Sequence, residues 1–122
     1  MAKIFDLNRK STLALRQRKQ ALLRQLHLPP NLLRASFVKQ FLTCGKPACP
    51  CHQNQDRKHG PYYYLLLCLG TGRIRKFSLK DPQQQHRAGD GTAAYTQFME
   101  GVEELSQINA ELLRRGDPLP AE

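Results

Sequence analysis

The chain opens with a helical pattern of hydrophobic and polar positions. Leu15, Leu22 and Leu26 recur on one face, and Arg and Lys residues occupy most of the other positions. No Gly or Pro interrupts this pattern before Pro29-Pro30, where a helix must end. The pattern therefore predicts a basic amphipathic helix over residues 7–28.

The middle of the chain has the pattern of a small antiparallel sheet. Short runs rich in β-branched and aromatic residues predict strands over residues 35–43, 61–69 and 73–80. Gly70-Thr71-Gly72 fits a hairpin turn between the last two strands. The run at 61–69 is the most apolar, so we expect both of its faces to be covered. Residues 44–59 are rich in Pro, Gly, Gln and Asn and are expected to form a loop.

A second helical pattern occupies the C-terminal part. Asp81-Pro82 predicts a short helical turn, and Gly89-Asp90-Gly91 is expected to break the chain. A final helix should then run from Thr92 to Arg115 and close at Gly116. Its apolar positions recur at three- and four-residue steps, with Asn109 in the remaining heptad position. They are Tyr95, Phe98, Val102, Leu105 and Leu112. This seam predicts a homodimer through the helix, with packing on the sheet or on the first helix as the alternatives.

These elements predict an α+β fold of four segments. A basic N-terminal helix occupies residues 1–30, and a β-sheet core with its loop occupies residues 31–88. An acidic amphipathic helix follows over residues 89–116. Residues 117–122 are expected to form a disordered tail. The sheet should have three antiparallel strands, flanked by the two helices.

Charge is distributed unevenly along the 122 residues, whose formal net charge is +9. Residues 1–80 hold 16 Lys and Arg against 2 acidic residues, whereas residues 81–122 hold 3 against 8. The basic charge of residues 1–80 indicates either an anionic partner or an acidic final helix that folds back on these residues. No apolar run of about 18 residues is present, and the start lacks the apolar core of a signal peptide. We therefore expect a cytoplasmic protein with no membrane partner.

The strongest chemical signal is the run Cys44-Gly-Lys-Pro-Ala-Cys49-Pro-Cys51 in the expected loop. Disulfides are disfavoured in a reducing cytoplasm, whereas clustered thiols beside an imidazole suit a tetrahedral Zn²⁺ site. His59 lies where the loop returns to the sheet. We therefore predict Zn²⁺ as the cofactor, bound by Cys44, Cys49, Cys51 and His59. Free thiols and a redox switch are the alternatives.

Two other residues compete with His59 for the fourth ligand position. Cys68 lies late in an apolar strand and is expected to be a small core residue. His52 follows Cys51 directly and would need an awkward return of its side chain. Apart from Asp56, no acidic residue lies near the loop, so a structural zinc is favoured over a catalytic one.

The loop and the strand after it resemble the signature of a family of small bacterial proteins of unknown function. The matching residues are Cys44-Gly45-Lys46-Pro47, Cys49, Cys51 and His59-Gly60-Pro61-Tyr62-Tyr63-Tyr64. Members of that family occur with mobile genetic elements, near recombinase or transposase genes. The resemblance, over roughly residues 35–80, implies a mobile-element setting and a recombinase or transposase as partner. The Gly89-Asp90-Gly91 segment departs from the family pattern, in which we expect a continuous helix.

Basic residues in the loop and the hairpin are the candidates for contacts with nucleic acid, and DNA is the expected form. The metal should hold loop and hairpin together, so that these residues cluster along a phosphate backbone. The alternative is that they only protect an edge strand from pairing. The candidates are Lys46, Arg57, Lys58, Arg73, Arg75 and Lys76.

Together these features predict a non-catalytic, zinc-binding, nucleic-acid-associated accessory protein. We find no Ser-His-Asp order, phosphate-binding glycine loop or carboxylate cluster, and Tyr62, Tyr63 and Tyr64 lack the Arg/His surroundings of a nucleophile. The competing hypothesis is a protein-protein interaction or dimerisation module, acting as a regulator or as a subunit of a larger complex. In that case the charges of the first and last helices pair with each other.

Overall fold

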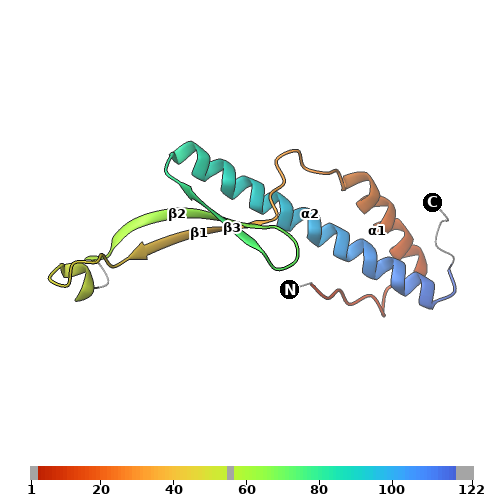
Figure 1. Cartoon of the computed structure of the whole chain (residues 1–122). Helices are drawn as coiled ribbons and strands as arrows, with labels where there is room; N and C mark the ends of the chain where they lie inside the picture. Colours follow the sequence, from red (N-terminus) through yellow and green to blue (C-terminus); the bar gives the residue numbers. More distant parts are fainter. Residues whose placement is uncertain (1–2, 55–56, 118–122) are drawn as a thin grey trace. The chain divides into compact units, whose positions relative to one another are not determined.

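The computed structural model describes residues 3–54 and 57–117 (Figure 1). It confirms the α+β class, with an N-terminal helix, a three-stranded antiparallel sheet and a long C-terminal helix. The elements are α1 (Thr12–Gln25), β1 (Ala35–Leu42), the short 3-10 helix η1 (Pro50–His52), β2 (His59–Cys68), β3 (Ile74–Leu79) and α2 (Pro82–Arg114). Two compact units share them: unit 1 is Met1–Pro30 with Ala94–Glu122, and unit 2 is Asn31–Ala93.

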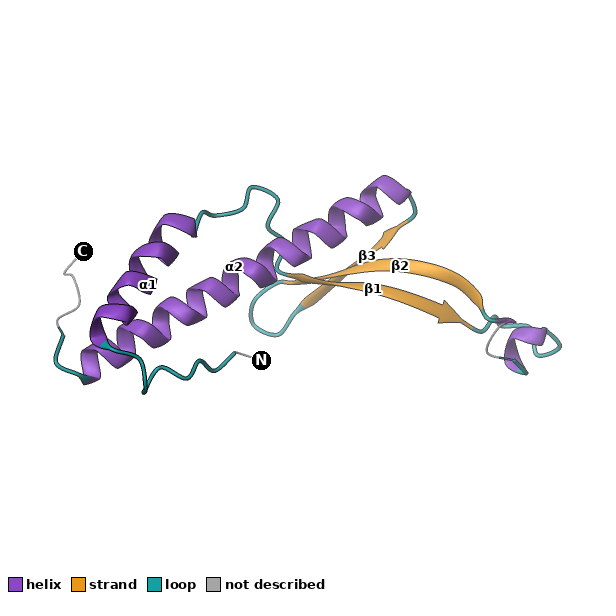
Figure 2. Cartoon of the chain, turned by 180° about the vertical axis from the view of Figure 1, so that it is seen from behind, coloured by secondary structure: helices purple, strands orange, loops and turns teal. Residues whose placement is uncertain are grey.

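The sheet has the strand order β1-β2-β3, and both pairs are antiparallel. In the first pair Leu42 lies opposite His59, and in the second Cys68 lies opposite Ile74. The loop between β1 and β2 and the turn between β2 and β3 therefore lie at opposite ends of β2 (Figure 2). This placement decides which basic residues can act together with the cysteine loop.

Only one face of β2 is well covered, so the expectation that both faces are covered is wrong. Leu65 is buried and lies between Phe37 and Phe77 in the strand register. Tyr63, on the same side of the strand, stacks its ring on that of Phe37 at 5.6 Å between centroids. On the other face, Tyr62 is 44% exposed. A three-stranded sheet with one helix beside it has elements enough to cover one face.

α1 begins later than predicted. The Ser11 hydroxyl accepts a hydrogen bond from the Ala14 backbone N–H at 3.1 Å, which is the usual N-cap bond. Residues 7–10, predicted as helix, precede this cap. The segment before it is bonded to α2 instead, because the Phe5 backbone N–H donates to the Gln107 side-chain oxygen at 2.9 Å.

The core of unit 1 lies between α1 and the second half of α2. Its buried side chains are Leu7, Leu15, Leu22, Ile108 and Leu112. Ile108 is 0% exposed although the predicted apolar seam did not include it. The face buried against α1 is thus rotated relative to the predicted seam, of which Leu112 is fully buried and Leu105 packs at the margin of the core.

α2 runs without a break through Gly89-Asp90-Gly91, contrary to the expectation from the sequence. The helix begins where Asp81-Pro82 predicted a helical turn: the Asp81 carboxylate accepts from the Gln83 backbone N–H at 3.0 Å. The reason for Gly91 is close packing, because a Cβ there would lie 2.7 Å from the Asn31 carbonyl oxygen.

The predicted closure of the helix at Gly116 is confirmed. Gly116 has a φ of +87°, and its N–H donates to the Leu113 carbonyl at 3.0 Å. Asp117, placed in the predicted tail, is bonded to Arg16; residues 118–122 of that tail lie outside the described residues. No helix within the described part of the chain is both long and apolar enough to cross a membrane.

Candidate metal centre

The four predicted metal ligands come together at the end of the β1–β2 hairpin. Cys44 follows the last residue of β1 by two positions, Cys51 lies within η1, and His59 is the first residue of β2. With Cys49, their ligand atoms all lie within 4.8 Å of one another. Antiparallel pairing brings the two ends of the loop together, and η1 turns Cys51 back toward Cys44.

The distances between donor atoms suit one tetrahedral ion. The Cys44 and Cys51 Sγ atoms are 3.6 Å apart, and Cys49 Sγ lies 3.4 Å from His59 Nε2. An ion about 2.3 Å from each thiolate sulfur requires tetrahedral edges of about 3.8 Å. A Cys₃His set at these separations can hold a metal ion with little rearrangement.

Cys49 and Cys51 lie in different electrostatic environments within the cluster. Cys51 is 1% exposed, and its Sγ accepts a hydrogen bond from the Cys44 backbone N–H at 3.3 Å. Burial raises the pKa of the Cys51 thiol, whereas hydrogen bonds led by the Cys51 backbone N–H lower the pKa of Cys49. A bound cation would offset the desolvation of a buried thiolate.

The two competing ligand candidates lie outside this cluster. Cys68 is exposed and lies opposite Ile74, at the other end of β2, so its assignment as a core residue is wrong. It lies on the uncovered face of the sheet with Tyr62 and Tyr64. His52 is exposed and is not a member of the cluster. Asp56, the one acidic residue near the loop in sequence, lies outside the described residues.

Gly60 also belongs to the site, although it was not among the predicted site residues. Its φ is +130°, a conformation that side-chain-bearing residues rarely adopt. A Cβ at this position would also lie 2.9 Å from the Gln40 carbonyl oxygen. Gly60 therefore lets β2 pass close to β1 directly after His59. The signal available in the sequence was a glycine next to a candidate ligand.

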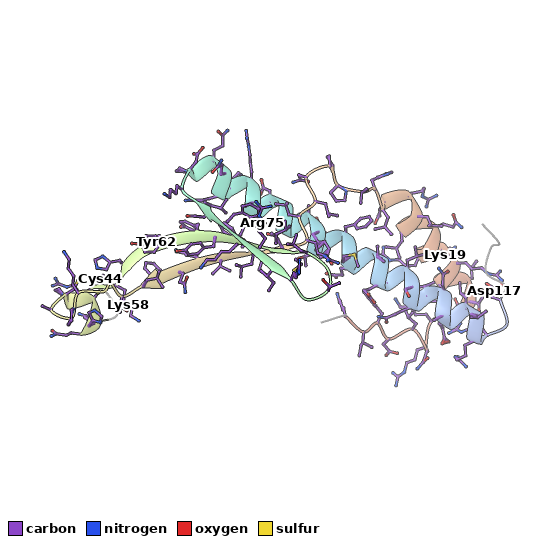
Figure 3. All side chains as sticks on the ribbon, in the orientation of Figure 1. Lys19, Cys44, Lys58, Tyr62, Arg75 and Asp117 are labelled. Carbon is purple, nitrogen blue, oxygen red and sulfur yellow. The ribbon has the colours of Figure 1, made fainter. Side chains whose placement is uncertain are left out.

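The six basic candidates do not form one cluster, and that expectation is wrong. Lys46, Arg57 and Lys58 accompany the cysteine loop, whereas Arg75 lies opposite Leu67 near the other end of β2 (Figure 3). Leu67 lies eight positions after His59 along β2, a span of about 26 Å. The other hairpin candidates lie beside Arg75: Arg73 in the turn and Lys76 on β3.

The two faces of β3 carry different cations. Arg75 lies over the Phe77 ring at 4.8 Å from its centroid, on the same side of the sheet as Leu65. Lys76 lies over the Tyr64 ring at 4.0 Å, on the uncovered side. The hairpin cations are thus divided between two surfaces, whereas those of the loop share one short segment.

In unit 1, by contrast, three basic residues of α1 and the segment before it pair with acidic residues of α2 and the segment after it. The Arg18 guanidinium makes two hydrogen bonds to Glu104, at 2.7 and 2.8 Å, and Arg16 bonds to Asp117 at 2.9 Å. Lys3 pairs with Glu100 at 3.0 Å. This agrees with the expectation that the acidic helix folds back on basic residues from the front of the chain.

Comparisons with known proteins give a family for this arrangement. Residues 12–85, from the start of α1 to the start of α2, match the model of a domain of unknown function, DUF6788. The match spans more than half of the chain and includes all four cluster residues. No curated protein and no solved structure is significantly similar. The chain therefore belongs to the DUF6788 family.

Proposed function

We propose that the chain is a non-catalytic, nucleic-acid-associated accessory protein whose loop is held in shape by a structural Zn²⁺. Three thiolates and one imidazole form a donor set that Zn²⁺ accepts in closed four-coordinate sites. When bound, the ion would fix the loop conformation and leave no position open for a substrate. Cys44, Cys49, Cys51 and His59 would hold it.

The observation that carries the nucleic-acid role is the uncompensated charge of the loop. Lys46, Arg57 and Lys58 form no ion pair with any residue in the described ranges. Unit 2 holds ten Lys and Arg against three acidic residues, whereas unit 1 holds nine against seven. Cations that have no ion-pair partner in the described ranges, on a loop fixed by a metal, are suited to contact phosphates.

Three double variants with the same change of net charge test this role. Arg57→Glu/Lys58→Glu alters the loop, Arg73→Glu/Arg75→Glu alters the hairpin, and Arg9→Glu/Lys10→Glu alters exposed residues before α1. Fluorescence anisotropy with duplex DNA, single-stranded DNA and RNA at increasing salt would measure binding. We expect the loop variant to lose binding at moderate salt, and its duplex salt slope to fall by about 1.8, or 0.9 per lost contact.

The outcomes separate the possible surfaces. Greater loss in the hairpin variant would move the interface to β3, and equal losses in all three would indicate attraction by net charge alone. Absence of binding to every nucleic acid at low salt would overturn the proposal. The mobile-element setting, with a recombinase or transposase as partner, is supported by the resemblance of the Cys-Gly-Lys-Pro and His-Gly-Pro-Tyr segments and belongs to the same proposal.

A further inference from the structure

Among the described residues of unit 1, a second face of α2 remains open beside the face buried against α1. It forms a groove of about 490 Å³ along about three turns of the helix. The groove differs from the core face, because Leu113 is 58% exposed whereas the adjacent Leu112 is 2% exposed. Its lining residues are Val102, Leu105, Ser106, Asn109, Ala110 and Leu113.

Asn109 gives this groove an unsatisfied polar group. Its side-chain Oδ1 is buried and has no hydrogen-bond partner among the described residues. A buried polar atom without a partner is unfavourable, and rotation of the amide can turn this oxygen toward the groove. An asparagine within an apolar helical seam commonly bonds to a polar group of a second helix.

We propose that the groove is the contact between two copies of this chain, whose α2 helices pack antiparallel. A two-fold interface must be self-complementary, so each contact occurs twice. One register satisfies this along the whole groove. Val102 lies opposite the partner's Leu113, and Leu105 lies opposite the partner's Ala110. Ser106 then lies opposite the partner's Asn109, where its hydroxyl can donate to the amide oxygen.

The charges beside the groove fix the direction of the partner helix. Glu103, near one end, forms no ion pair with a described residue. Arg114, near the other end, has a side chain that is 67% exposed. The Nε and Nη2 atoms of Arg114 donate hydrogen bonds to Glu111 of the same chain, whereas Arg114 Nη1 bonds to no described residue. Antiparallel packing brings Glu103 beside the partner's Arg114, whereas parallel packing would bring like charges together.

The contact is short, because the helix between Val102 and Leu113 is about 17 Å long. An interface of this size corresponds to a reversible association rather than to an obligate dimer. Nothing in it involves the cysteine cluster or the basic loop. The dimer is therefore independent of the proposed zinc and nucleic-acid roles.

Sedimentation equilibrium of the full chain, over micromolar to millimolar concentrations, tests the association. We expect a concentration-dependent shift from monomer to dimer mass. Leu113→Asp should keep the chain monomeric, and because this side chain is exposed, the helical circular dichroism should not change. Leu13→Asp is the matched control, since Leu13 is exposed on α1 (64%) and lies outside the groove. Wild-type protein that stays monomeric, or equal dissociation of both variants, would overturn the proposal.

Photo-crosslinking tests whether the two α2 helices pack antiparallel. A benzoylphenylalanine in place of Leu113 is introduced into unlabelled protein, which is mixed with ¹⁵N-labelled wild-type protein before irradiation. Mass spectrometry should find mixed-isotope crosslinks to the peptide that contains Val102. Crosslinks confined to the peptide around residue 113 would indicate parallel helices and contradict the register.

Discussion

A side chain at Gly91 would collide with Asn31: a Cβ added to this helical glycine would lie 2.7 Å from the Asn31 carbonyl oxygen. The Gly91 carbonyl in turn accepts a hydrogen bond from the Leu33 backbone N–H at 3.1 Å. The chain before β1 is therefore bonded directly to the backbone of α2. Backbone cannot yield as a flexible side chain can, so glycine is required at this turn of the helix.

Gly89 and Gly91 should respond in opposite ways to substitution by alanine. Gly91→Ala forces the backbone apart, and we expect the free energy of unfolding to fall by about 1–3 kcal/mol. Gly89→Ala meets no atom within 4 Å and removes a flexible residue from a helix interior. It should raise the free energy of unfolding by about 1 kcal/mol. Urea denaturation followed by circular dichroism measures both; similar effects would contradict the packing described for α2.

The zinc content of the protein should depend on the four cluster residues and not on cysteines outside the cluster. We expect protein purified without added metal to contain about one zinc per chain, because four ligands make one tetrahedral site. Cys51→Ser removes a buried ligand and should abolish zinc retention and lower the melting temperature. Cys68→Ser, which alters an exposed cysteine of β2, is the control and should retain zinc. Elemental analysis after gel filtration would refute the site if both variants kept their zinc.

The two histidines of the loop region provide a test of the fourth ligand. His59→Ala should weaken zinc binding, because its imidazole Nε2 lies 3.4 Å from Cys49 Sγ. His52→Ala should leave zinc affinity unchanged, since that side chain is exposed and outside the cluster. Competition with a chromogenic chelator measures the affinity of each variant. A larger effect at His52 would show that the loop rearranges when it binds the ion.

Acid should weaken unit 1 through Glu111. Hydrogen bonds from Arg114 and Arg115 lower the pKa of Glu111 from 4.5 to about 2. Because the folded pKa is the lower one, this stabilisation is complete above pH 4.5 and is lost as the pH falls toward 2. Glu111→Gln should therefore lower stability at pH 7 and flatten its dependence on pH in this window.

The control for this pH prediction is Glu100→Gln. Glu100 and its partner Lys3 have side chains that are 51% and 59% exposed, so their ion pair should contribute little. Both variants keep the four cluster residues, so any effect of acid on metal binding is common to them. Thermal unfolding from pH 2 to 7 would contradict the role of Glu111 if the two profiles coincided.

The strands and the cysteine cluster could be predicted from the sequence because their signals are local. β-branched and aromatic runs define β1, β2 and β3 to within one or two residues. Three cysteines within a short loop are close enough in sequence to bind one metal ion together, so the ligands could be predicted without the fold. His59 followed from the same reasoning, since it lies where the chain re-enters the sheet opposite Leu42.

Two wrong predictions, the break in α2 and the choice of its buried face, concern features that residues far away in the chain determine. Gly89 and Gly91 suggested a break, but Gly91 is required by Asn31, sixty positions earlier in the chain. Ile108 was missed because the face of α2 that is buried depends on where α1 packs. The clustering of Arg73 with Lys58 failed for another reason: the loop precedes β2 and the turn follows it, so the two lie at opposite ends of that strand, as the predicted strands already implied.

The closure of the loop between Leu42 and His59 also bears on how fast the sheet can form. Without an ion, pairing of β1 with β2 requires closing a flexible loop of residues 43–58, which has an entropic cost that slows folding. Cys44, Cys49 and Cys51 are close in sequence and can bind an ion before any strand has formed. Once His59 also binds the ion, Leu42 and His59 are adjacent, and pairing of the two strands can extend from that point. The metal would then act as a folding nucleus and also fix the conformation of the folded loop. Refolding should be faster with zinc present than with zinc chelated.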